Sequence, residues 1–185
     1  DVRLSRGLGD VYKRQLICDL TDMELANASL YDGATSVAEA ISVAINKTKR
    51  DNVVISNGFN PNTKEVVNTL VDRNKFNINY VDLVDYLFPE DYVFSQDDAA
   101  FVVSLPHYEG SAQDLTSIVH NAKAAGVITI CYADPSMLGI LKSPGSMGFD
   151  IVVAEGQSMG SPLSFGGPTV GWCATRKELA RLVPG

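Results

Sequence analysis

The sequence predicts an α/β fold in which a mostly parallel β-sheet is flanked by helices. Short apolar runs rich in β-branched residues alternate along the chain with longer segments of helical pattern, as in sheets built from strand–helix units. The apolar runs show no strict alternation with polar residues, which indicates strands buried on both faces. Sheets of this kind bind ligands at the carboxyl ends of their strands, so functional residues are expected directly after the strands.

Four segments are predicted to be helical, and three of them carry a terminal signal. Ser36 and Glu39 have the spacing of a capping box near the start of the first helix. Asn60 and Pro61 suit the N-cap and the first helical position of the second helix. Gly126 is suited to end the third helix. The predicted helices cover residues 36–49, 60–73 and 112–126 and a final segment that starts at residue 176.

The predicted strands are apolar runs that lie between these helices and the turns around them. Their lengths and their content of valine and isoleucine are typical of buried strands. The run at residues 99–105 gives the strongest strand prediction. The predicted strands cover residues 52–56, 77–82, 99–105, 127–132, 150–155 and 169–175.

The first fifteen residues differ from the rest of the chain. They hold four lysine or arginine residues and two glycines, and they show no clear period. We interpret residues 1–15 as a non-native N-terminal scar and expect the domain to occupy residues 16–185. Because that domain would begin inside an element, we expect the chain to be part of a longer polypeptide.

Charge and composition limit the partners of the chain. The net charge of −7 disfavours binding to nucleic acid through its phosphates. No apolar run reaches the roughly 18 residues of a membrane-spanning helix, so no membrane partner is expected. Cys18, Cys131 and Cys173 are odd in number and far apart, which favours buried thiols in a reducing, cytoplasmic setting over a disulfide framework. His107 and His120 share no metal-ligand spacing, and no metal site is expected.

Three segments near the expected strand ends carry candidate chemistry. Residues 29–40 place a glycine and two hydroxyl residues at the start of a helix, which is either an anion site for a group such as phosphate or an ordinary capped helix start. Asp134 stands at a strand tip, where a carboxylate can pair with a protonated ring nitrogen or cap the next turn. His107 follows the strongest strand and is either a ligand contact or a hydrogen-bonded loop residue.

The pentapeptide GQSMG at residues 156–160 matches the nucleophile elbow of hydrolases, which would make Ser158 a nucleophile. The elbow needs a helix directly after the turn, whereas Pro162 and two further glycines follow here. It also places its histidine after the serine, and no histidine follows His120. The sequence therefore does not favour a hydrolase.

Longer motifs point to a different chemistry. A glycine-headed helix, a strand-tip aspartate and a strand followed by a glycine-rich loop occur in the order that resembles the large domain of fold-type-I pyridoxal-phosphate enzymes. Residues 27–40 (NASLYDGATSVAEA), 133–175 (with EGQ and PLSFGGP) and 181–185 (RLVPG) resemble more closely the glycine decarboxylase P-protein of the glycine cleavage system. The resemblance is to the N-terminal-half form, which is subunit 1 of the two-subunit enzyme, and it extends over residues 16–185.

The resemblance implies glycine decarboxylation with pyridoxal phosphate bound to a lysine, and transfer of an aminomethyl group to the lipoyl arm of H-protein. Alignment on the Gly-Gly-Pro at residues 166–168 places Gln157 where the catalytic subunit has this lysine. Asp134 and Thr35 match the positions near the pyridine nitrogen and the phosphate. Without the lysine, all three cofactor-binding positions are expected to be vestigial. The resemblance thus implies a chain without catalytic residues, paired with a lysine-bearing catalytic subunit that holds the pyridoxal phosphate.

Two alternatives stay open at this point. The chain could be a self-sufficient pyridoxal-phosphate enzyme that uses an unexpected lysine, such as Lys142. It could also be a non-enzymatic α/β module for assembly or ligand binding.

Overall fold

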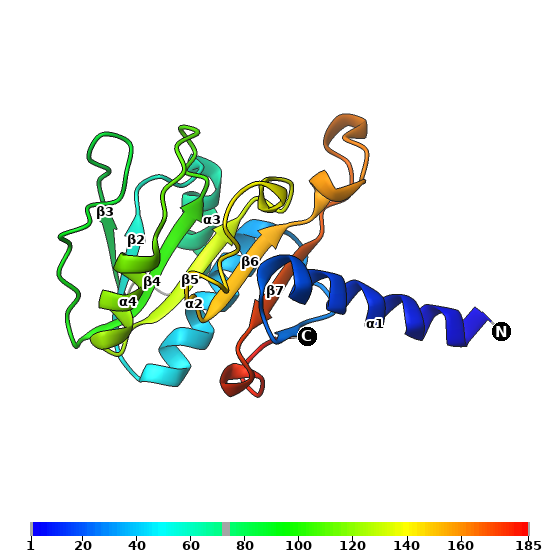
Figure 1. Cartoon of the computed structure of the whole chain (residues 1–185), viewed down its shortest axis with the longest axis horizontal. Helices are drawn as coiled ribbons and strands as arrows, with labels where there is room; N and C mark the ends of the chain where they lie inside the picture. The colour runs from blue at the N-terminus through cyan, green and yellow to red at the C-terminus, as the bar shows by residue number, and fades with distance from the viewer. Residues whose placement is uncertain (1, 72–74, 185) are drawn as a thin grey trace.

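The computed structural model of the chain describes residues 2–71 and 75–184 (Figure 1). Its helices are α1 (Val2–Thr21), α2 (Gly33–Thr48), α3 (Pro61–Leu70) and α4 (Thr116–Ala124). Its strands are β1 (Leu25–Ala26), β2 (Asn52–Ser56), β3 (Asn77–Val81), β4 (Asp98–Leu105), β5 (Ile128–Ala133), β6 (Ile151–Glu155) and β7 (Gly171–Thr175). Short 3-10 turns are η1 (Met137–Gly139), η2 (Gln157–Met159), η3 (Ser164–Gly166) and η4 (Lys177–Leu179).

The described strands join one sheet in the order β1-β7-β6-β5-β4-β2-β3. Strands β2 to β6 run parallel, whereas β7 is antiparallel to β6 and β1 is antiparallel to β7. Every residue of β4 is buried, as predicted for a central strand covered on both faces. The mostly parallel sheet is confirmed, and each predicted strand is present within two residues of its predicted bounds.

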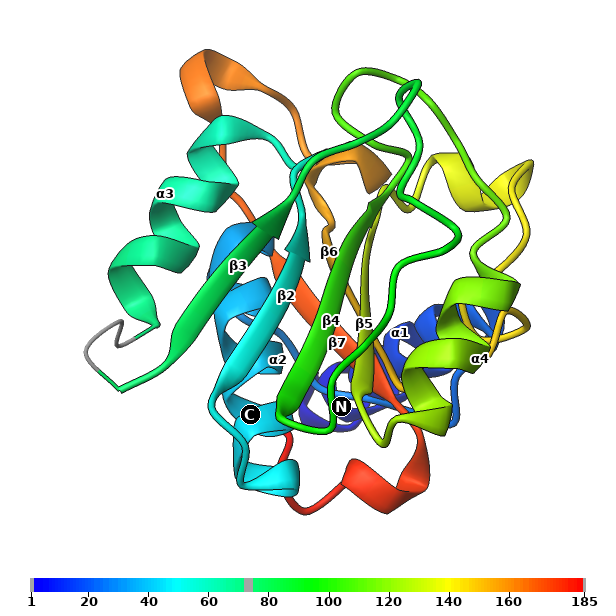
Figure 2. The ribbon, with the colours of Figure 1, turned by 90° about the vertical axis from the view of Figure 1, so that its left-hand side faces the viewer.

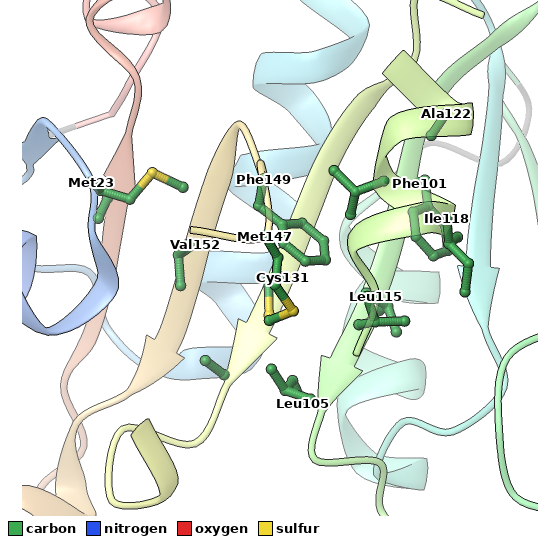
Figure 3. Packing of buried hydrophobic residues seen from close by; sticks show 14 of the residues in the cluster. Met23, Phe101, Leu105, Leu115, Ile118, Ala122, Cys131, Met147, Phe149 and Val152 are labelled. Atoms are coloured by element: carbon green, nitrogen blue, oxygen red, sulfur yellow. The ribbon is translucent and has the colours of Figure 1, made fainter. Parts of the chain in front are cut away.

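Each face of the sheet packs against its own helices (Figure 2). One hydrophobic cluster joins residues of α1 and α4 to side chains from β4, β5 and β6. Figure 3 shows part of this cluster, in which Phe149 lies beside Met147 and Cys131. The second cluster joins α2 and α3 to the opposite face of the same strands. Consecutive strand residues therefore belong to different cores, which fixes the register of the sheet.

Helix α2 begins earlier than predicted, and its cap is a different residue. The carboxylate of Asp32 accepts a hydrogen bond of 2.7 Å from the backbone N–H of Thr35, which makes Asp32 the N-cap. The hydroxyl of Ser36 instead donates to the carbonyl oxygen of Asp32 from inside the helix. The predicted capping box of Ser36 and Glu39 is therefore wrong, because a stronger cap lies one turn upstream.

Other helix boundaries also differ from the prediction. Asn60 caps α3 as predicted, and the predicted residues 72–73 of that helix lie outside the described residues. Helix α4 begins at Thr116 rather than residue 112, and the predicted final helix is only the turn η4. The sequence does not predict α1, since residues 1–15 show no clear period. The interpretation of residues 1–15 as a non-native scar stays a prediction.

Replacing Asp32 with alanine is expected to lower the free energy of unfolding by about 1 kcal/mol, because the first turn of α2 loses its cap. Urea denaturation of the purified chain measures this change. Asp51→Ala is a matched control, since Asp51 is exposed just before β2, and it should change the value by less than about 0.5 kcal/mol. Equal effects of the two substitutions would contradict the capping role.

Candidate functional site

A cavity of about 810 Å³ opens at the carboxyl ends of β4, β5 and β6, where the sequence predicts ligand binding. Loops that follow four strands contribute to its wall. The lining residues are Asn60, Ser104, Pro106, His107, Tyr108, Tyr132, Ala133, Asp134, Pro135, Glu155, Gln157, Ser158, Gly160, Ser161, Pro162 and Leu163. This cavity is the candidate functional site.

Of the three predicted cofactor-binding residues, Asp134 and Gln157 line the cavity, whereas Thr35 is not among the lining residues. Asp134 follows β5, and its Oδ1 atom accepts hydrogen bonds from the backbone N–H (2.9 Å) and the hydroxyl (2.7 Å) of Ser136. The carboxylate thus caps the turn that leads into η1. A contact between Asp134 and a ring nitrogen stays a prediction.

The side chain of Gln157 closes the glycine-rich loop between β6 and β7 (residues 156–170). Its Nε2 atom donates to the carbonyl oxygens of Gly166 (2.6 Å) and Pro168 (3.2 Å). Gly167 has a φ of +62°, and a Cβ atom there would collide with the backbone carbonyl of Pro162. The loop therefore needs glycine at residue 167 for its fold, and the Gln157 amide holds the two ends of the loop together.

A residue that the sequence does not single out, Glu155, joins this loop to helix α2. Its Oε1 atom accepts hydrogen bonds from the backbone N–H groups of Gln157 and Val170, each at 2.9 Å. Its Oε2 atom accepts a hydrogen bond of 2.9 Å from the backbone N–H of Gly33 at the start of α2. Gly33 and Glu155 are 122 residues apart, so the sequence does not show that they meet. The only signal for Glu155 in the sequence is its position at a strand tip, directly before a glycine.

The first turn of α2 is closed by a second carboxylate. The two oxygens of Asp32 accept hydrogen bonds from the backbone N–H (2.7 Å) and the hydroxyl (3.0 Å) of Thr35. The backbone N–H of Ser36 donates to the carbonyl oxygen of Asp32 at 3.0 Å. The polar groups of Thr35 are thus engaged within the turn.

The cavity is acidic. Asp134 and Glu155 line it, and no lysine or arginine of the described residues does so. The ring of Tyr132 stacks on Phe59 with centroids 5.7 Å apart. Burial, followed by the carboxylates of Glu155, Asp134 and Asp32, raises the pKa of Tyr132 to about 12, so its phenol stays protonated at neutral pH.

These residues do not fit a bound pyridoxal phosphate. A phosphate group needs free N–H donors or cations, whereas carboxylates of Asp32 and Glu155 already engage donors at the start of α2. No lysine lines the cavity within the described chain, so none is placed there to bind the cofactor covalently. Lys142 lines a different pocket, where its Nζ atom lies 2.8 Å from the Thr116 hydroxyl and 3.3 Å from Asp114 Oδ2.

The geometry also disfavours a hydrolase. After β6 the chain forms the three-residue turn η2 instead of the α-helix that a nucleophile elbow requires. Ser158 lines the cavity, but no hydrogen bond joins it to His107 or His120, all of which lie in the described part of the chain. Within the described residues, no histidine is therefore bonded to this serine as a general base.

His107 is a buried cavity residue with an exposed fraction of 2%. Neither of its ring nitrogens has a hydrogen-bond partner among the described residues. Its backbone N–H donates to the Ser111 carbonyl at 2.8 Å, which ties the main chain of this loop together. Burial lowers the pKa of His107, and the neighbouring Glu109 carboxylate and Gln113 side chain act in the opposite direction.

The His107 pKa predicts a pH dependence of stability. A histidine whose pKa is lower in the folded state favours folding in its neutral form, and this contribution is lost as the pH falls below its ordinary value of 6.5. The unfolding free energy of the wild type, minus that of His107→Asn, should therefore fall by an amount of order 1 kcal/mol between pH 7.5 and 5.5. Urea titrations of both chains at three pH values measure this difference, and a difference that grows on acidification would contradict it.

Comparison with solved structures identifies the fold. A cystathionine gamma-lyase from Lactobacillus plantarum, complexed with L-serine, matches 92% of this chain and 43% of its own with a TM-score of 0.73 at 17% identity. The fold is therefore that of fold-type-I pyridoxal-phosphate enzymes, as predicted. A glycine decarboxylase (P-protein) of the glycine cleavage system, in inhibitor-bound form, matches 93% of this chain and 39% of its own with a TM-score of 0.89 at 37% identity.

Sequence comparison identifies the family. Residues 11–185 match the family model described as "Glycine cleavage system P-protein". Relatives named "Probable glycine dehydrogenase (decarboxylating) subunit 1" from Geotalea uraniireducens and Staphylococcus haemolyticus are 42% and 43% identical over 91% and 92% of this chain. The chain belongs to the glycine cleavage system P-protein family, as the motifs predict. It spans 39% of the length of these two curated relatives.

The described residues offer neither a membrane-spanning helix nor a clustered metal site. None of their helices combines the length and apolarity that are needed to cross a membrane. No group of three or more histidine, cysteine, aspartate or glutamate side chains among them is placed to hold a metal ion.

Proposed function

We propose that the chain belongs to subunit 1 of a glycine dehydrogenase (decarboxylating) of the glycine cleavage system. It supports glycine decarboxylation and aminomethyl transfer to the lipoyl group of H-protein without carrying the cofactor lysine. Family membership and the identity to relatives named as subunit 1 support this proposal. The observation that carries it is the cavity at the carboxyl edge of the sheet, which no lysine of the described residues lines.

In this proposal the partner is a lysine-bearing catalytic subunit, and that subunit holds the pyridoxal phosphate. The positions of Asp134, Thr35 and Gln157 are vestigial, and their side chains serve local structure. Each of the three has hydrogen bonds within its own turn or loop, which supports this view. The chain contributes the shape of the assembled active site and of the route for the lipoyl arm.

We also propose a cytoplasmic location. Cys18, Cys131 and Cys173 are free and buried, which suits a reducing compartment. Burial raises the pKa of Cys173 to about 12, so this thiol is not poised for oxidation or disulfide exchange.

The test is reconstitution of activity. The purified protein is mixed with the lysine-bearing subunit of a two-subunit glycine decarboxylase, with H-protein and with pyridoxal phosphate. Exchange of labelled bicarbonate into the carboxyl group of glycine is expected only when both subunits are present. Exchange catalysed by this protein alone, or no exchange with its cognate catalytic subunit, would contradict the proposal.

The two alternatives predict different results. A self-sufficient enzyme would show a covalent adduct of pyridoxal phosphate on one lysine after borohydride reduction and mass spectrometry, and Lys142→Ala would remove it. A non-enzymatic module would bind partners without restoring exchange. Lys142 forms an ion pair with Asp114 away from the candidate cavity, so its position does not favour the self-sufficient enzyme. The same ion pair gives no support to the non-enzymatic module.

A further inference from the structure

The carboxylate of Glu155 lies where helix α2 would otherwise bind an anion. A helix N-terminus presents free N–H groups and a partial positive charge. Here the N–H of Gly33, the first residue of α2, donates to Glu155 Oε2 at 2.9 Å. The N–H groups of Gln157 and Val170 donate to Oε1, each at 2.9 Å. Three backbone donors from separate segments thus converge on one carboxylate, which is how proteins hold a bound oxyanion.

The polar groups of Thr35, also in the first turn of α2, are engaged as well. The N–H and the hydroxyl of Thr35 donate to the carboxylate of Asp32, at 2.7 and 3.0 Å. The start of helix α2 and the end of strand β6 are also in direct contact. A Cβ atom added to Gly33 would lie 2.8 Å from the Cβ and backbone N atoms of Glu155. A phosphate group therefore has no place between α2 and the Glu155 carboxylate.

Charge acts in the same direction as packing. A phosphate group that approached the start of α2 would meet the carboxylates of Asp32 and Glu155, with Asp134 on the cavity wall. Within the described residues, no lysine or arginine lines the cavity to offset this repulsion.

We propose that Glu155 is an internal anion that takes the place of the cofactor phosphate, so that this chain excludes pyridoxal phosphate even when a lysine stands at residue 157. The exclusion is thus separate from the absence of the lysine. The proposal rests on the family assignment, but it does not depend on the partner subunit or on the reaction. It can therefore fail while the proposed function holds, and the reverse is also true.

The first experiment restores the lysine. Gln157→Lys and the double variant Glu155→Ala/Gln157→Lys are incubated with pyridoxal phosphate, reduced with borohydride and analysed by peptide mass spectrometry at residue 157. The single variant should label no more than an exposed lysine such as Lys142. The double variant should gain at least about tenfold in occupancy, the ratio that corresponds to one charge-assisted hydrogen bond.

The second experiment uses inorganic phosphate alone. The thermal unfolding midpoint is compared in phosphate and in sodium chloride of equal ionic strength for the wild type, for Glu155→Ala and for Asp134→Ala. With about 20 mM phosphate, the midpoint of Glu155→Ala should rise by about 2–4 °C relative to the wild type, because three N–H donors are free to bind the ion. Asp134→Ala is the matched control, since it removes a cavity carboxylate without freeing those donors, and it should behave like the wild type.

Several results would overturn the proposal. Stoichiometric labelling of residue 157 in Gln157→Lys would show that the carboxylate does not exclude the cofactor. A phosphate response of the wild type equal to that of a folded Glu155→Ala chain would show that the donors are not blocked. If Glu155→Ala does not fold, Glu155→Gln replaces it in both experiments, because it removes the charge and keeps the size of the side chain. Retention of cofactor at residue 157 in Gln157→Lys refutes the proposal in either case.

Discussion

Replacing Phe149 with alanine is expected to lower the free energy of unfolding by about 3–5 kcal/mol, the range for truncation of a buried aromatic side chain. Phe149 is fully buried just before β6, in the cluster that joins the sheet to α1 and α4 (Figure 3). Truncation leaves a cavity that the surrounding strands cannot close. Urea denaturation, followed by the fluorescence of the buried Trp172, measures the loss.

The same substitution at Phe165 provides the matched control. Phe165 is fully exposed on the glycine-rich loop, so Phe165→Ala should change the free energy of unfolding by less than about 0.5 kcal/mol. A loss below about 1 kcal/mol for Phe149→Ala would contradict the packing of this cluster.

Gly33→Ala is expected to destabilise the chain by about 1–3 kcal/mol, although alanine is the better helix former. The added methyl group would lie 2.8 Å from the backbone nitrogen of Glu155 and from the hydroxyl of Tyr132. The backbone of β6 cannot yield, so α2 must move away and weaken the hydrogen bond between Gly33 and Glu155. Differential scanning calorimetry of the purified chain would detect the lower midpoint.

Gly139→Ala is the control for this prediction. Gly139 has no atom within 4 Å of an added Cβ and is exposed at the end of the turn η1. Its substitution should be neutral within about 0.5 kcal/mol. Stabilisation by Gly33→Ala, as helix propensity alone would give, would show that helix and strand are not in contact at this point.

The sequence predicts the sheet well because strand signals are local. Apolar runs such as residues 99–105 owe their burial to their own composition, and each predicted strand forms. Helix ends are less well predicted, since two capping residues can compete within one turn. Asp32 lies only four residues before Ser36, and the sequence pattern alone does not show which of them caps α2.

The candidate site is predicted in part. The strand-tip position of Asp134 and the loop position of Gln157 follow from the order of the elements, and both residues line the cavity. Thr35 does not line it, and its polar groups bond to Asp32 instead. Glu155 escapes prediction because its role depends on a contact with Gly33 across 122 residues, which only the fold brings together.

The three hydrogen bonds of Glu155 have a consequence for the stability of this part of the fold. A domain whose helix N-terminus is completed by a dissociable anion gains stability in proportion to the supply of that ligand, by mass action. Here the anion is a side chain of the same polypeptide, so its local concentration is fixed by the fold. The region around α2 and the glycine-rich loop can therefore complete these hydrogen bonds without a bound anion, whatever the phosphate concentration around it.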